Sequence, residues 1–200
     1  MGIDETMLGR LANFAFGYEN IRKDIFESFR PDHITSKKWL VHEIVKHTKG
    51  DFKRVAVLGS WNSIVLKELL GCSRNVVHWD FYDINHNCHR DRDMYHESND
   101  IQRNYTCFEV DVPSLFSHED VHQQYDLIIN PSCEHMDDIK AVKGPMYALT
   151  SNDYEGIKGH INCITKHEEL AAKNGINTIE YEGSLKLTNY TRFCTIGRVT

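Results

Sequence analysis

The sequence predicts an α/β fold in which a mostly parallel sheet of seven strands ends in an antiparallel hairpin and is covered by helices. Short apolar segments typical of strands begin only after residue 50, and the first five alternate with helical or loop segments. Such alternation favours parallel strands, because a parallel connection needs a long crossover. The last two segments are joined only by Gly183 to Tyr190, a spacing that suits an antiparallel hairpin. The expected strands are 54–58, 76–82, 105–110, 125–130, 145–150, 176–182 and 191–198.

The chain before the first strand is expected to be helical. Apolar side chains recur there at helical spacing in two stretches, and Pro31 is expected to end the second because proline lacks an N–H group. Ser36 can then cap a third helix, Lys37 to Lys46. The apolar positions of the two stretches are Leu8, Leu11, Ala12, Ala15 and Phe16, followed by Ile21, Ile25, Phe26 and Phe29.

Helices are also expected between the strands. Ile64 to Leu70 follows the first strand, and Lys166 to Lys173 ends at Asn174-Gly175, where glycine can close a helix in the left-handed conformation. The run Asp126 to Ile129 is apolar after its aspartate, as expected for a central strand covered on both faces.

The length of 200 residues predicts a single domain, 1–200, made of a helical cap over 1–50 and an α/β core over 51–200. The net charge of -6 gives no general attraction to nucleic acid, although the chain has a local basic group. The first residues lack the pattern of a secretion signal, and no apolar run could span a bilayer. The six cysteines form no CxxC pair, so we expect a cytoplasmic protein with reduced thiols and no membrane partner. The basic group is Arg22, Lys23, Arg30, Lys37 and Lys38.

The end of the first strand is typical of a nucleotide-binding turn. Glycine at this point lets the backbone approach a ligand, and the following helix offers unpaired N–H groups at its start. A tight turn without a ligand is the alternative, because dinucleotide fingerprints carry two or three glycines and this one carries a single glycine. Trp61 could form a wall of the pocket or belong to the core. The turn is Gly59, Ser60, Trp61, Asn62 and Ser63.

Acidic residues follow the next two strands. Asp83, before Ile84, can accept hydrogen bonds from both hydroxyls of a ribose, or it can cap the segment that follows. Asp80 is a competing acid on the same strand. Asp111, before Val112, can accept the exocyclic amino group of an adenine, or it can serve only the turn at its own position.

A polar segment from Asn130 to His135 follows the fourth strand. Asn130 can present its carbonyl to an amino group, and Glu134 and His135 can act as acid or base. Alternatively, Ser132 and Glu134 cap a short helix through 136–140. Cys133 is a weak candidate for a nucleophile, because no partner is identifiable in the sequence.

Metal-ligating residue types crowd the segment between residues 86 and 96. Their spacing matches no known zinc pattern well, so we expect a solvated loop or helix face and no metal. The residues are His86, Cys88, His89, Asp91, Asp93 and His96.

Taken together, the strand ends resemble those of class I, Rossmann-like methyltransferases that depend on S-adenosylmethionine. The likeness covers roughly residues 33 to 199 and is greatest to a small type found in phage and bacterial genomes. It rests on Val57 to Asn62, Asp80 to Asp83, Glu109 to Val112, Tyr125 to Asn130, the helix at Ser36 to Leu40 and the hairpin at Tyr190 to Phe193.

The resemblance implies a Rossmann-like three-layer sandwich with S-adenosylmethionine over the ends of the first and fourth strands. Asn130 to Cys133 is also similar to the Asn-Pro-Pro-Tyr element of amino-group methyltransferases, but it departs from that element at Ser132 and Cys133. The implied catalytic residues are Asn130, Glu134 and His135. The implied cofactor-binding residues are Gly59, Ser60, Trp61, Asn62, Ser63, Asp83, Ile84, Asp111, Val112, Asn130 and Ser132.

Two other functions fit the same sequence. One is a different enzyme on this type of sheet, which uses the same cofactor in another way or binds a dinucleotide or nucleotide sugar. The other is a relative without catalysis that is kept for binding. The methyl acceptor is not predicted beyond a nucleotide or nucleic acid, a protein side chain or a small metabolite, and neither is the oligomeric state.

Overall fold

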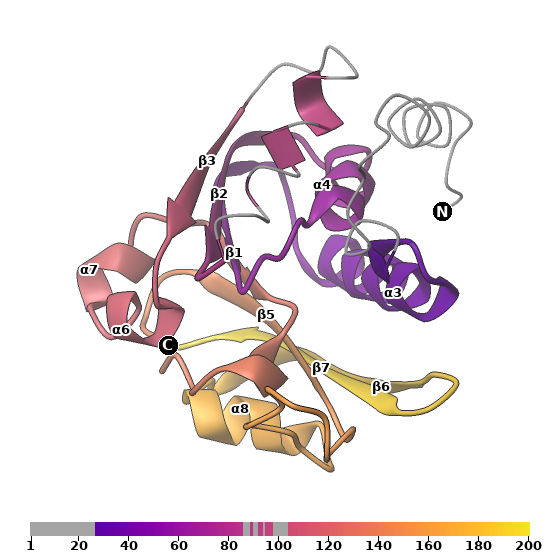
Figure 1. Cartoon of the computed structure of the whole chain (residues 1–200). Coiled ribbons are helices and arrows are strands. Elements are labelled where there is room, and N and C mark those ends of the chain that lie inside the picture. The colour runs from indigo at the N-terminus through magenta and orange to yellow at the C-terminus, as the bar shows by residue number, and fades with distance from the viewer. Residues whose placement is uncertain (1–26, 86–88, 90–91, 94, 98–103) are drawn as a thin grey trace.

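A computed structural model describes residues 27–85, 89, 92–93, 95–97 and 104–200 of the chain. The seven predicted strands form one sheet in the order β3-β2-β1-β4-β5-β7-β6 (Figure 1). Strands β1 to β5 pair in parallel, and β7 runs antiparallel to both β5 and β6, which confirms the predicted mixed sheet. The strands are β1 Phe52–Leu58, β2 Val76–Asp83, β3 Tyr105–Glu109, β4 Leu127–Asn130, β5 Met146–Asn152, β6 Thr178–Lys186 and β7 Thr191–Arg198.

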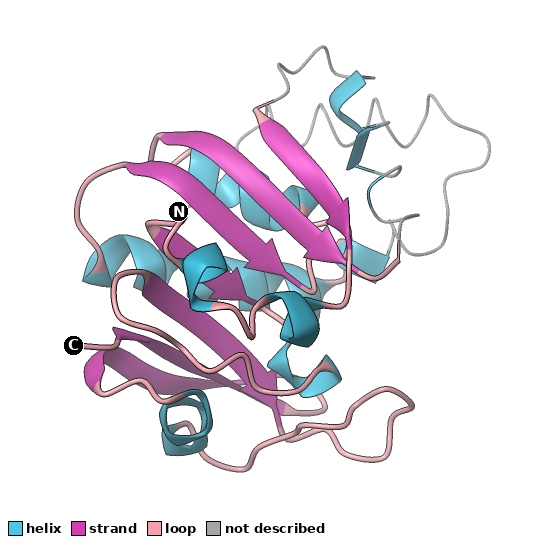
Figure 2. Cartoon of the chain, turned by 90° about the vertical axis from the view of Figure 1, so that its left-hand side faces the viewer, coloured by secondary structure: helices cyan, strands magenta, loops and turns pink. Residues whose placement is uncertain are grey.

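Helices lie on both faces of the sheet, so the fold has the three predicted layers (Figure 2). The side chains of β1 show how: Val55 and Val57 pack with α3 and α4 on one face, whereas Ala56 and Leu58 pack with α6 and α8 on the other. All four residues of β4 are buried, as its apolar sequence predicts for a strand covered on both faces. The helices are α3 Pro31–His47, α4 Ile64–Gly71, α6 Val112–Leu115, α7 Glu119–His122 and α8 Glu168–Asn174.

The expected cap is described only in part, because residues 1–26 lie outside the described chain. Within the described part, α3 packs against α4, β6 and β7 and thus belongs to the helical layer of the core. Residues 27–28 are helical and 29–30 form a turn, so a helix ends before Pro31 as predicted. Pro31 itself begins α3, where its missing N–H group has no intrahelical partner to lose, and the helix expected from Lys37 therefore starts six residues earlier. Ser36 is therefore buried inside the helix and does not cap it.

The other boundaries follow the sequence with two differences. The short helix considered for 136–140 does not form. Instead, a 3-10 turn, η1 Cys133–His135, ends at Met136, which is extended. Strand β6 reaches Lys186, so the hairpin loop is shorter than expected. Helix α8 ends as predicted, with Gly175 left-handed at φ 75°.

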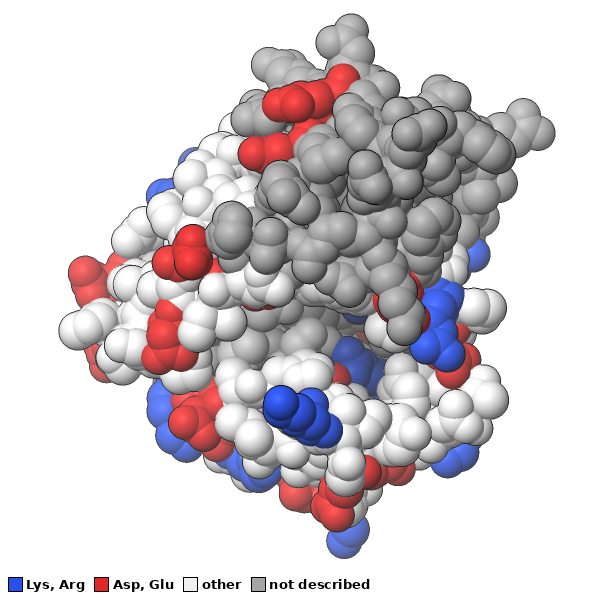
Figure 3. Space-filling model, viewed as in Figure 1, with Lys and Arg blue, Asp and Glu red and all other residues white. Residues whose placement is uncertain are grey.

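On the face of the molecule shown in Figure 3, the described acidic and basic side chains lie in small scattered groups, and neither charge covers a large continuous area there. None of the helices in the described ranges is both long and apolar enough to cross a membrane.

Two glycines predict opposite effects of the same substitution. A Cβ on Gly197 of β7 would lie 2.5 Å from the carbonyl oxygen of Thr178 and 2.7 Å from Cγ2 of Ile176, so Gly197→Ala should cost about 1–3 kcal/mol of unfolding free energy. Gly71, in α4, has no atom within 4 Å of such a Cβ, and Gly71→Ala should stabilise by about 0.5–1 kcal/mol. Urea denaturation measures both changes. Equal effects of the two substitutions would contradict this packing of β6 against β7.

Candidate active site

A cavity of about 820 Å³ opens where the parallel strands end at their carboxyl termini. This is the edge at which sheets of this topology bind ligands, because the strand order reverses between β1 and β4. Most of the residues expected at the site line this cavity. They are Gly59, Trp61, Asp83, Ile84, Asp111, Val112, Ser132, Glu134 and His135.

The bend after β1 requires a glycine. Gly59 has φ 53°, and a Cβ there would lie 2.5 Å from the terminal methyl carbon of Met136. Trp61 and Ser63 also take left-handed backbone conformations, at φ 45° and 46°. Such conformations are costly for residues other than glycine, and they concentrate at binding sites and active sites.

Asp83 faces this bend. Its Oδ2 accepts the backbone N–H of Trp61 at 2.7 Å, and its Oδ1 accepts the N–H of Asn85 at 2.9 Å. The competing acid, Asp80, is fully buried and bonded to Arg54 at 2.6 Å and to the hydroxyl of Tyr125 at 2.9 Å. The geometry therefore leaves Asp83, and not Asp80, on the cavity wall.

Three residues of the turn lie behind the bend and not on the main cavity. Ser60, Asn62 and Ser63 are buried and line a separate space of about 20 Å³. The Ser63 hydroxyl donates to the carbonyl of Ser60, and Asn62 Oδ1 accepts the N–H of Ile64 at 3.4 Å. The short turn uses these polar side chains to satisfy its own backbone, and cofactor binding by Ser60, Asn62 and Ser63 stays a prediction.

Arg92 supports the same turn, and the sequence analysis missed it. Its guanidinium donates to the carbonyls of Asn62 at 2.8 Å and Trp61 at 2.7 Å and to Oγ of Ser60 at 3.2 Å. It lies 3.8 Å above the ring of Phe81. The sequence does show a basic residue at this position in the polar segment 86–96, but that segment was considered only as a source of metal ligands.

Apolar and acidic groups share the wall beside Asp83. Ile84 is 72% exposed, which is unusual for a large apolar side chain, whereas Val112, at the start of α6, is buried. Asp111 comes directly before that helix and lines the cavity, as does Ile84. A flat ring with polar edges is the kind of ligand that this mixture suits.

Asn130 lies beneath the cavity and not on its wall. Its side chain is 1% exposed, its Oδ1 accepts the N–H of Ser132 at 3.0 Å, and its Nδ2 donates to the sulfur of Met136 at 3.2 Å. In this conformation the Asn130 amide is engaged with Ser132 and Met136, and the predicted contact with an amino group would require it to turn toward the cavity. Burial also raises the pKa of the Cys133 thiol well above its ordinary value, which disfavours the thiolate that a nucleophile needs.

Glu134 anchors the far end of the cavity. It is 3% exposed, and its Oε1 accepts hydrogen bonds from Nη1 of Arg192 at 2.5 Å and from Nδ2 of Asn152 at 2.7 Å. Arg192 also donates to the carbonyl of Pro131. The site thus joins the ends of β4 and β5 to the beginning of β7, a convergence that the sequence could not show because the three residues are far apart along the chain.

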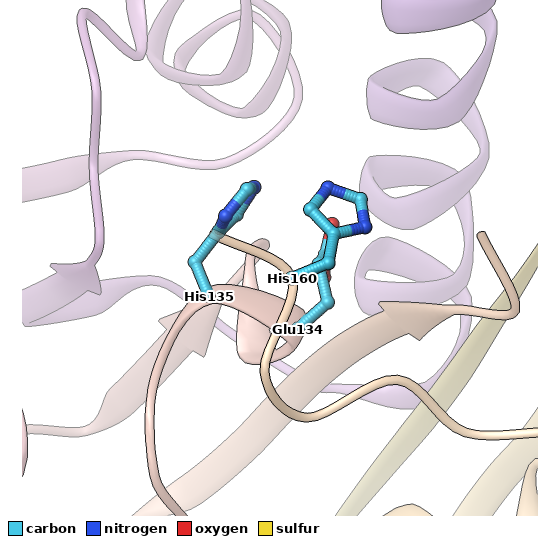
Figure 4. A group of neighbouring side chains, drawn as sticks. All are labelled: Glu134, His135 and His160. Carbon is cyan, nitrogen blue, oxygen red and sulfur yellow. The ribbon is translucent and has the colours of Figure 1, made fainter. Parts of the chain in front are cut away.

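Two histidines meet beside Glu134 (Figure 4). His135 is exposed, and His160 comes from the connection between β5 and α8. Their ring centroids are 4.6 Å apart at an angle of 88°. His160 was not among the expected site residues.

Helix α3 supplies basic groups that the sequence analysis did not place at the site. Burial, followed by the nearby charge of Arg192, lowers the pKa of Lys37 to about 8. Burial, followed by the charges of Lys37 and Arg192, lowers the pKa of His33 to about 4. His33 also lies against Trp61, with ring centroids 5.7 Å apart.

The low pKa of His33 predicts that acid weakens the fold. Between the ordinary value of 6.5 and about 4, the unfolded chain binds a proton that the folded chain does not. The contribution of His33 to the unfolding free energy therefore falls as pH drops through this window and is constant above it. His33→Phe keeps a ring beside Trp61 but cannot titrate, so its stability should fall less steeply from pH 7 to pH 4 in urea denaturation. Identical slopes in the two proteins would contradict a buried, neutral His33.

No model of a known protein family matches the sequence, and a search of curated proteins finds no match. Solved structures, in contrast, share the fold. A putative sarcosine dimethylglycine methyltransferase from Galdieria sulphuraria superposes with a TM-score of 0.62 at 13% identity and covers 98% of each chain. The magnesium protoporphyrin IX methyltransferase of Synechocystis PCC 6803, solved with bound S-adenosyl-homocysteine, has a TM-score of 0.58 at 14% identity over 98% of this chain and 96% of that one.

Other similar structures are longer than this chain. TrmK of M. capricolum, in complex with S-adenosyl-homocysteine, has a TM-score of 0.54 at 11% identity over 79% of this chain. The chain spans 66% of TrmK and 48% of a putative methyltransferase from Streptococcus mutans. What these comparisons establish, at identities of this size, is that the chain has the class I, Rossmann-like fold of S-adenosylmethionine-dependent methyltransferases.

Proposed function

We propose that this protein is a methyltransferase that uses S-adenosylmethionine and binds it in the cavity at the ends of β1, β2 and β4. The observation that carries the proposal is the position of Asp83, a carboxylate on the cavity wall that is held against the glycine bend by the N–H of Trp61 at 2.7 Å. A carboxylate at this point of such a sheet can accept hydrogen bonds from both hydroxyls of a ribose. The cavity volume of about 820 Å³ is within the range of small-molecule sites.

The residues present fit an adenosine. Gly59 has φ 53°, which a residue with a side chain rarely adopts, so the backbone can bend close to the ligand. The exposed Ile84 gains a partner when an adenine ring covers it, and Asp111 can accept the exocyclic amino group. These roles agree with the contacts that the sequence predicted for the same residues.

When bound, S-adenosylmethionine supplies a methyl group that its sulfonium has already activated toward nucleophiles. The task of the protein is to hold the acceptor in line with that methyl group and to exclude water. We assign this task to the end of the cavity formed by Glu134, His135 and Lys37. His135 and Lys37 can take a proton from the acceptor, whereas Glu134, already paired with Arg192, positions it.

Asn130 has a supporting role in this proposal. Because its amide is bonded to Ser132 and Met136, it fixes the chain that carries Glu134 and His135. A cofactor-binding and catalytic asparagine, as the sequence suggested, would need that amide on the cavity wall. Together with Ser132 and Cys133 in place of proline and tyrosine, this favours an acceptor other than an amino group stacked on an aromatic side chain.

Titration calorimetry with three compounds tests the cofactor. S-adenosylmethionine and S-adenosylhomocysteine should both release or absorb heat with a stoichiometry near one, and NAD should not. Folded protein that binds neither sulfur compound, or that binds NAD alone, would refute the proposal and favour the dinucleotide alternative.

Asp83→Ala should weaken S-adenosylhomocysteine binding by about 1.5–3 kcal/mol, or roughly 10- to 150-fold, because two hydrogen bonds to a charged group are lost. The matched control is Glu109→Ala, which removes the exposed acid paired with Asp83 in register on β3. That control should bind normally.

Substitution of the buried acid, Asp80, should change the stability of the protein and not its affinity for the ligand. Asp80→Asn weakens the pair with Arg54 and should lower the unfolding free energy by about 1–3 kcal/mol while leaving ligand affinity unchanged. If Asp80→Asn lost affinity and Asp83→Ala kept it, the ribose would have been assigned to the wrong carboxylate.

A further inference from the structure

Glu134, His135 and His160 form a compact group of metal-ligating side chains on the cavity wall (Figure 4). Each offers one ligand atom, and these atoms all lie within 4.8 Å of one another. Tetrahedral bonds of about 2.1 Å place ligand atoms about 3.4 Å apart, so the group must contract by roughly an ångström or more to hold an ion. His135 is exposed and His160 comes from a connecting segment, so small side-chain rotations can supply that contraction.

Hydrogen bonds to backbone carbonyls fix the tautomer of both imidazoles. Nδ1 of His135 lies 3.1 Å from the carbonyl oxygen of Gly159, and Nδ1 of His160 lies 2.8 Å from that of Tyr154. A carbonyl can only accept, so each Nδ1 carries the proton and each Nε2 keeps its lone pair. Backbone carbonyls that fix the tautomer in this way are a regular feature around metal-bound histidines.

The carboxylate of Glu134 has one oxygen that is not used in the contacts with Arg192 and Asn152. Oε1 of Glu134 accepts from Arg192 and Asn152, but its Oε2 is buried and has no hydrogen-bond partner among the described residues. A buried, unpartnered oxygen of this kind is costly, and a cation would satisfy it. The pair with Arg192 offsets the charge of Oε1 and leaves Oε2 as the ligand.

We propose that Glu134, His135 and His160 bind a divalent transition-metal ion of the kind that accepts two imidazoles and a carboxylate, with Zn²⁺ as the reference case. This donor set occurs in catalytic zinc sites, which keep a further position open for water or substrate. All three residues line the cavity, so that position faces the space for the acceptor. In the part of the inference that rests on the proposed function, the ion binds an oxygen of the acceptor and lowers its pKa, and Lys37 takes the proton because His135 is then a ligand of the ion.

Calorimetry with Zn²⁺ alone, on chelator-treated protein, tests the site. His135→Ala and His160→Ala should each lower Zn²⁺ affinity at least about tenfold. His167→Ala is the matched control, because His167 also lies beside a glutamate, 3.5 Å from Glu168, but is not part of the group. It should leave affinity unchanged. Circular dichroism of each variant verifies the fold, and Co²⁺ absorption provides a second readout of ligand number.

The same variants separate this inference from the proposed function. S-adenosylhomocysteine should bind His135→Ala and His160→Ala with unchanged affinity, because neither residue belongs to the part of the cavity assigned to adenosine. Zn²⁺ affinity that is absent in the wild-type protein, or equal in wild type and both variants, would overturn the metal site whatever the sulfur compounds do. Loss of S-adenosylhomocysteine binding in the wild-type protein, with Zn²⁺ binding intact, would overturn only the methyltransferase.

Discussion

The buried ion pair between Glu134 and Arg192 is the interaction on which the far end of the cavity depends. The two residues are 3% and 6% exposed, and charges so far from water are tolerated only when they are paired and hydrogen-bonded. Glu134 follows β4, Arg192 is the second residue of β7, and Asn152 ends β5, so one carboxylate oxygen links three strands. The antiparallel edge of the sheet is thereby fixed to the chain that leaves the switch point. The protein's own contacts hold this wall, as the proposed positioning of an acceptor requires.

The opposite end of the cavity is organised mainly by the backbone. Asp83 accepts two N–H groups, and Arg92 donates to two carbonyls of the turn that contains Trp61. The left-handed conformations of Trp61 and Ser63 persist because these contacts outweigh their cost. The two ends meet at Met136, which follows His135 in the chain and whose terminal methyl carbon would lie 2.5 Å from a Cβ on Gly59. The chain after β4 thus packs against the bend after β1.

The fold could be predicted because apolar runs and connection lengths are local properties of the chain. The continuous apolar run in β4 predicted that this strand lies in the centre of the sheet. The short connection before β7 predicted that β6 and β7 form an antiparallel hairpin. The helix end before Pro31 was predictable, but Ser36 was wrongly taken as the next cap because the sequence does not show that Pro31 also begins the following helix. At the site, Gly59 and Asp83 were predictable from strand ends. The partners of Glu134 were not, since Arg192 is 58 positions away and its approach depends on the sheet order. The buried roles of Asn130, Ser60 and Asn62 were missed because strand ends show which residues are near the edge, but not which way their side chains turn.

The charges around the acceptor end limit what can bind there. Lys37 and His33 have lowered pKa values because burial and the neighbouring guanidinium of Arg192 oppose further positive charge. A divalent ion at Glu134 adds two charges to this region, and Glu134 supplies only one negative charge, already shared with Arg192. An acceptor with an anionic oxygen would complete the balance by binding the ion and facing Lys37 at the same time. Metal and acceptor should then bind more tightly together than apart, because each relieves the electrostatic cost of the other. If the proposed ion is bound, a neutral acceptor offers no such relief, so we propose on electrostatic grounds that the acceptor carries an anionic oxygen and is not a neutral amine.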